Sequence, residues 1–166
     1  PMNAIPTKPA TIYETVRQRV VTATGIDEAW VFLTPAPELV GRVPPSSAAF
    51  AAVVPAGVHF PESPQHEHAC PVDVRFDVCL FSRVAIDRAF EGRKLLTDPA
   101  RGLFPLADKV VKALAGSSLE DAESQLTRSP IQCLGIDATR WAEGANIILA
   151  YVVVRFLAPI LYNLQE

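Results

Sequence analysis

The architecture of this chain follows from one stretch of nine residues, Val72-Asp73-Val74-Arg75-Phe76-Asp77-Val78-Cys79-Leu80. Apolar side chains occupy every second position, and charged side chains fill most of the positions between them. This period of two predicts a β-strand with one buried face and one wet face. The rest of the chain must therefore supply neighbouring strands and a layer that covers the apolar face.

An amphipathic segment before this strand predicts a helix from about residue 11 to residue 24. Ile12, Val16 and Val20 recur on one helical face. Thr11-Ile12-Tyr13-Glu14 has the capping-box pattern, in which a hydroxyl and a carboxylate each satisfy an unpaired backbone N–H. The prolines at positions 1, 6 and 9 predict an extended arm over residues 1–10.

A second helix is predicted over residues 103–114, where apolar residues recur at helical spacing and Gly116 follows. A charged stretch, residues 85–102, is expected to be a long loop, and residues 117–129 are expected to be a polar linker. Short aromatic and β-branched runs predict the remaining strands. These runs are residues 29–34, 48–54 with a bend at 55–57, and a closing hairpin of 131–141 and 147–157, followed by a tail from 159 to 166.

The predicted order is helix, three strands, helix, two strands. This order is typical of an α+β fold, with an antiparallel or mixed sheet of about four to five strands. The N-terminal helix and one major helix would pack on that sheet. A length of 166 residues predicts a single domain, residues 1–166, that includes the extended arm.

The composition limits the classes of function that the chain can have. The net charge of −3 and the isoelectric point of about 5.6 argue against broad DNA binding, which needs a basic face. A mean hydropathy of +0.21 is slightly apolar, as in chains that bury surface in an oligomer. No run reaches the ~18 apolar residues of a membrane-spanning helix. We expect a soluble protein made in a cytoplasm, with no membrane association.

Candidate metal ligands occur in one cluster, His66, His68 and Cys70. A closed structural zinc site needs four ligands, and the only other histidine is His59. We therefore expect no metal and no cofactor. The sequence also has no Gly-x-Ser-x-Gly turn and no phosphate-binding glycine loop, so we expect no enzymatic activity.

Candidate interface residues lie mainly in the charged stretch. It is locally basic within an acidic chain, which suits contact with a partner protein. Tryptophan side chains such as Trp30 and Trp141 are expected to anchor the core or an interface. The residues predicted to form a protein interface are Arg88, Arg93, Lys94, Arg101 and Trp30.

The order of these elements resembles the tail terminator, or tail completion (neck), proteins of tailed phages. The resemblance is carried by residues 12–20, 72–78 and 103–114 and by the hairpin within 131–157. It covers most of the chain as an order of elements and includes no diagnostic short motif. The loop at 35–47 and the segment at 61–71 are longer than such a minimal domain needs.

The resemblance implies a structural virion protein without catalysis. Copies would close a ring, expected to be hexameric, through heterologous contacts. The ring would terminate the tail tube, meet the head–tail connector and lie close to any tail sheath. DNA would pass through its lumen without specific binding. The protein would be assembled in the host cytoplasm and end in the neck of the virion.

Two other readings stay open. The chain could be another neck, connector or baseplate structural protein. It could also be a small α+β module that binds a ligand or a metal, which predicts a concave apolar pocket with converging polar groups.

Overall fold

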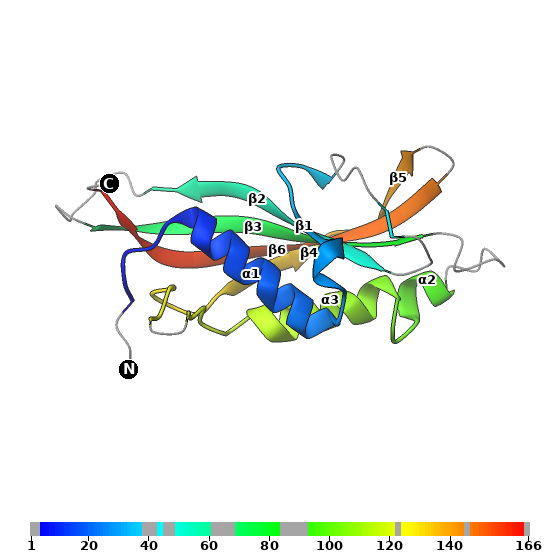
Figure 1. Ribbon diagram of the computed structural model, residues 1–166, viewed down its shortest axis with the longest axis horizontal. Helices are drawn as coiled ribbons and strands as arrows, with labels where there is room; N and C mark the ends of the chain where they lie inside the picture. The colour runs from blue at the N-terminus through cyan, green and yellow to red at the C-terminus, as the bar shows by residue number, and fades with distance from the viewer. Residues whose placement is uncertain are drawn as a thin grey trace.

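The fold is a long, twisted sheet with its helices packed on one face (Figure 1). The computed structural model describes residues 4–37, 43–44, 49–60, 69–83, 93–121, 124–144 and 147–164. The helical elements are α1 (Pro9–Thr24), η1 (Glu28–Trp30), α2 (Arg93–Thr97) and α3 (Leu103–Leu114). The strands are β1 (Val31–Leu33), β2 (Phe50–His59), β3 (Ala69–Arg83), β4 (Gln132–Ile136), β5 (Arg140–Gly144) and β6 (Ile147–Asn163).

The sheet is mixed, and its described strands number six, in the order β1-β2-β3-β6-β4, with β5 also paired to β6. β1 runs parallel to β2, and the other pairs are antiparallel. The α+β prediction is confirmed. The expected count of four to five strands was low, because the segment 131–141 forms β4 and β5 rather than one strand. β4 and β5 pair with successive parts of β6 along the same edge.

The central pair, β3 and β6, carries the predicted alternation. Val74, Phe76 and Val78 are fully buried, whereas Arg75 between them is exposed. β3 extends beyond the predicted 72–80, and β6 extends to Asn163. The predicted tail at 159–166 was therefore wrong for its described part. The Pro159 carbonyl accepts a hydrogen bond from the Arg128 amide at 2.9 Å, so the missing N–H of Pro159 lies on that side of β6, beyond the end of β4, and not in the ladder with β3.

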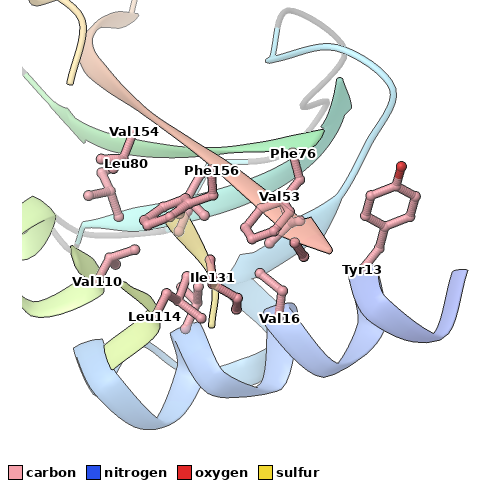
Figure 2. Close-up of a cluster of buried hydrophobic side chains, with 14 of the residues drawn as sticks. Tyr13, Val16, Val53, Phe76, Leu80, Val110, Leu114, Ile131, Val154 and Phe156 are labelled. Carbon is pink, nitrogen blue, oxygen red and sulfur yellow. The ribbon is translucent and has the colours of Figure 1, made fainter. Parts of the chain in front are cut away.

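The main core lies between the sheet and the helices. Figure 2 shows Val16 of α1, together with Val110 and Leu114 of α3, pointing toward Phe76 and Phe156 on the sheet. The rings of Phe76 and Phe156 stack with centroids 5.3 Å apart. The predicted helix over 103–114 is confirmed residue for residue.

α1 begins two residues earlier than predicted, and the capping-box interpretation was wrong. Lys8 is the N-cap residue and makes no side-chain cap, while Pro9 occupies the first turn. Proline is suited to this position because its fixed φ is helical and its missing N–H has no partner to lose. Thr11 lies inside the helix, where its carbonyl accepts a hydrogen bond from the Thr15 hydroxyl at 2.8 Å.

Two predicted loops contain more structure than expected. The stretch 85–102 includes the short helix α2, whose Leu95 is buried in the core. The stretch 117–129 is not simply a polar linker, because Leu119, Leu126 and Thr127 in its described part are buried. The Thr127 hydroxyl accepts a hydrogen bond from the Leu119 amide at 3.1 Å.

The arm lies on its own domain where the structure describes it. The Ile5 amide donates to the Gln125 carbonyl at 3.1 Å, and the Thr7 amide donates to the Leu161 carbonyl at 2.7 Å. Residues 4–7 therefore bridge the end of β6 and the segment around Gln125. None of the described helices has the length and apolar character needed to cross a membrane.

Candidate interaction surfaces

A hollow lies where the end of α1, η1 and the turn between α2 and α3 meet. Its volume is about 240 Å³. Two of the predicted interface residues, Trp30 and Arg101, line it together although they lie far apart in the sequence. The other lining residues are Thr24, Gly25, Ile26, Asp27, Ala49 and Ala100.

Local capping builds the α1 side of this hollow. Gly25 ends α1 with φ of 70°, a left-handed conformation that favours glycine. The Asp27 carboxylate then accepts a hydrogen bond from the Ala29 amide at 2.9 Å and starts η1. Trp30, which ends η1, is half-buried and packs edge-to-face on Phe32, with ring centroids 6.1 Å apart.

The opposite wall is a tight turn organised by Asp98. Its carboxylate accepts hydrogen bonds from the amides of Ala100 and Arg101, each at 3.0 Å, and these bonds lower the pKa of Asp98. The Gly102 amide donates to the Asp98 carbonyl at 2.7 Å. A Cβ on Gly102 would come within 2.5 Å of the Asp98 backbone nitrogen, so the turn requires glycine there.

A second surface is an apolar patch at the β4–β5 edge, formed by Ile136, Trp141 and Ile148. These side chains are 46%, 60% and 49% exposed. Trp141 pairs with Ala150 and Ile136 pairs with Val154 in the register. Ala150 and Val154 are buried in the main core, and directly paired residues share a face of the sheet. The apolar patch therefore belongs to the face on which the helices pack.

The sequence did not predict that Ile136, Trp141 and Ile148 form one apolar patch. Trp141 was identified only as a core or interface anchor. The missing information was the register, because pairing to β6 decides on which face of the sheet the side chains of β4 and β5 lie. The bulge between Cys133 and Gly135, which leaves Leu134 exposed, has no simple sequence signal beyond the glycine.

The other face of the sheet carries a charged cluster that sequence reasoning also missed. Arg155 reaches Asp137 at 2.9 Å, and Arg140 reaches the same carboxylate at 3.1 Å. Asp77, paired with Arg155 in the register, is half-buried, and this burial raises its pKa against the opposing effect of Arg155. Farther along this face lies a small apolar cluster, in which the rings of Phe50 and Phe81 stack with their centroids 4.7 Å apart.

The remaining predicted interface residues do not join the hollow. Lys94 is exposed on α2, which begins at Arg93. Arg88 lies outside the described residues.

Of the metal candidates, His66 and His68 also lie outside the described residues. Cys70 is fully buried in the main core, and its thiol contacts the Pro71 carbonyl at 3.6 Å. Within the described part of the chain, no group of three or more His, Cys, Asp or Glu side chains could hold a metal ion.

The fold and its surfaces define an α+β domain with an open sheet and apolar side chains exposed at its edges. Comparison with solved structures finds the same fold in a chain of the virion of a native gene transfer agent (GTA) particle. The match has a TM-score of 0.52 and 15% sequence identity, and it covers 90% of this chain and 94% of that one. At this identity, the likeness concerns the fold. No family model matches the chain, and no curated protein matches it either.

Proposed function

We propose that this chain is a structural virion protein of a phage-like particle. It would form a ring in the neck that terminates the tail tube and joins it to the head connector. The observation that carries the proposal is the shared fold with the GTA virion chain, which extends over nearly the whole length of both chains. A partial overlap could reflect one common supersecondary unit, but the match covers 90% of this chain and 94% of that one.

The surfaces of the molecule suit assembly. Two edges of the sheet are open among the described residues. β1 pairs only with Ala51 to Val53, so β2 from Val54 to His59 has no strand on that side. β4 and β5 form the other edge. Open edges with exposed apolar side chains are unusual on a monomer and typical of surfaces that join copies.

The hollow favours assembly over small-ligand binding. Its volume of about 240 Å³ lies below the roughly 300–1,000 Å³ of typical small-molecule sites. It is large enough for one bulky side chain of a partner. A role elsewhere in the neck, or in the baseplate, would use the same surfaces with a different axial partner.

Tube assembly in vitro tests the proposal. The tail tube protein of the same particle is allowed to polymerise with and without this chain, and tube lengths are measured by negative-stain electron microscopy. Termination predicts shorter tubes that carry this chain at one end, with the ends identified by a gold label on a C-terminal tag. Tubes of unchanged length with unlabelled ends contradict the terminator role. In a second mixture that also contains the head connector or the baseplate, a label on that component alone would favour the neighbouring structural roles.

A further inference from the structure

We propose that the apolar patch of one copy (Ile136, Trp141 and Ile148) docks on the hollow of the next copy, with Trp141 entering between Trp30 and Arg101. This inference rests on the proposed function, because it names the contact that would join copies in the ring. The occupant of the hollow is therefore a second copy of this chain.

The sheet topology places the two surfaces on opposite edges. The register aligns Phe50 of β2, Phe81 of β3, Tyr151 of β6 and Arg140 of β5 in one row across the sheet. Ala49, at the hollow, and Trp141, in the patch, each lie one residue from the ends of this row. Three strand spacings of about 4.8 Å separate the two sides by about 14 Å. Trp141 therefore cannot fill the hollow of its own chain without breaking the sheet.

The same row explains why the contact would close a ring. A contact between two different surfaces is heterologous, and it gives a closed ring only when successive copies are not displaced along the axis. The hollow and the patch lie at the same level along the strands, at the end of the sheet where β2 begins and β5 pairs. Edge-to-edge docking at one level adds little shift between neighbours.

Size and polarity match across the proposed contact. Ile26, Ala49 and Ala100 give the hollow apolar walls, which suit the indole of Trp141. Trp141 is the most exposed large apolar side chain among the described residues, at 60%. Leu33, which is 44% exposed on β1, adds an apolar side chain to the same edge of the sheet as the hollow.

Cross-linking between copies tests the contact directly. Ile148→Cys protein, which keeps Trp141, is mixed with Ala100→Cys protein and oxidised, and dimers are scored on a non-reducing gel. Ala100 is exposed at the rim of the hollow, so its substitution leaves the core intact. The control mixture pairs Ile148→Cys with Lys112→Cys, since the Lys112 side chain is 75% exposed on α3 and does not line the hollow. Wild-type protein gives the background from Cys70, Cys79 and Cys133.

Mass measurements with two further variants complete the test. Trp141→Ala removes the inserted side chain, and Ala100→Trp fills the hollow from its rim. An interface hot spot of this kind predicts that either change raises the concentration at half assembly by about 30-fold or more. Thermal unfolding followed by circular dichroism should match that of the wild type, because both sites are exposed in the described structure.

The outcomes separate this contact from the proposed function. A disulfide-linked dimer in the Ile148→Cys and Ala100→Cys mixture, absent from the control, supports the contact. A wild-type oligomer without that cross-link, whose mass survives Trp141→Ala and Ala100→Trp, overturns the contact and leaves the ring standing. A wild-type protein that stays monomeric at every concentration and with tube protein overturns both.

Discussion

At the residue scale, Arg17 connects three elements although it lies off the apolar stripe of α1. Its guanidinium bonds the Glu14 carboxylate at 2.6 Å and the Glu28 carboxylate at 3.0 Å. It also donates to the carbonyls of Glu28 and Val31, at 3.4 and 3.3 Å. Its side chain is only 15% exposed, whereas the Glu14 and Glu28 side chains are 51% and 60% exposed. Arg17 therefore fixes η1 and β1 against α1 and helps to shape the hollow.

Arg17→Gln is expected to lower the free energy of unfolding by about 1–3 kcal/mol, as for lost hydrogen bonds to charged groups. The matched control is Lys112→Gln, which removes an exposed ion pair to Asp108 and should change stability by less than about 0.5 kcal/mol. Urea unfolding followed by tryptophan fluorescence measures both. Equal effects of the two variants would show that the Arg17 bonds do not hold these elements together.

Asp77→Asn is expected to stabilise the protein at neutral pH. Burial raises the pKa of Asp77 above its ordinary value of 3.8, so the folded state holds its proton more tightly than the unfolded state does. The stability contributed by Asp77 is therefore highest below pH 3.8 and falls as pH rises through the folded-state pKa. The difference in unfolding free energy between Asp77→Asn and wild type should be positive at pH 7 and vanish near pH 3.

Glu14 and Glu28 change in the opposite sense, which is why the difference between variants is measured rather than the total. Their pKa values are lowered by hydrogen bonds, from Arg17 to Glu14 and chiefly from Gln18 to Glu28. Their contribution is present above their ordinary value of 4.5 and is lost as pH falls through their folded-state values. Wild type and Asp77→Asn both lose this contribution of Glu14 and Glu28 to stability. A difference that persists unchanged at pH 3 would contradict the role assigned to Asp77.

At the scale of elements, strong periodicity made the predictions reliable. The alternation in β3 and the apolar spacing in α3 gave the right elements, because each pattern commits many side chains to one face. The predicted bend at 55–57 is also confirmed, since β2 continues past a register shift between Pro55 and Gly57. Burial of a whole face outweighs any local preference over such lengths.

Predictions failed where tertiary contacts override local signals. In α1, the helix begins at Pro9 and not at the capping-box pattern that starts with Thr11. In β6, Pro159 does not end the strand, because β6 pairs with β3 on both sides of it in the sequence. The hollow shows the same limit for the site. Trp30 and Arg101 could be identified as interface residues one at a time, but their meeting depends on how α1 and α3 pack.

The packing of α3 on the sheet gives a direct test of the core. Leu114→Ala should lower the free energy of unfolding by about 2–5 kcal/mol, because Leu114 is fully buried and its loss leaves a cavity. Phe104→Ala on the same helix removes a side chain that is 45% exposed and should cost clearly less. Thermal or urea unfolding of both variants checks the order. A cost for Phe104→Ala as large as that for Leu114→Ala would contradict this placement of α3.

At the scale of the whole molecule, the helices pack on a sheet whose two edges remain open among the described residues. The long β3–β6 pair fixes the distance between those edges, with β1 and β2 on one side and β4 and β5 on the other. Of the nine exposed large apolar side chains among the described residues, four lie on or next to the β4–β5 edge: Leu134, Ile136, Trp141 and Ile148. A molecule built in this way can repeat around an axis, with each copy offering one edge to each neighbour.

The most direct measurement of the central claim is the mass of the purified protein in solution, by light scattering over a range of concentrations, alone and with tail tube protein. A ring predicts one discrete oligomer, expected to be a hexamer, or a monomer that becomes that oligomer when tube protein is added. A monomer or dimer whose mass changes neither with concentration nor with added tube protein would contradict the proposed ring.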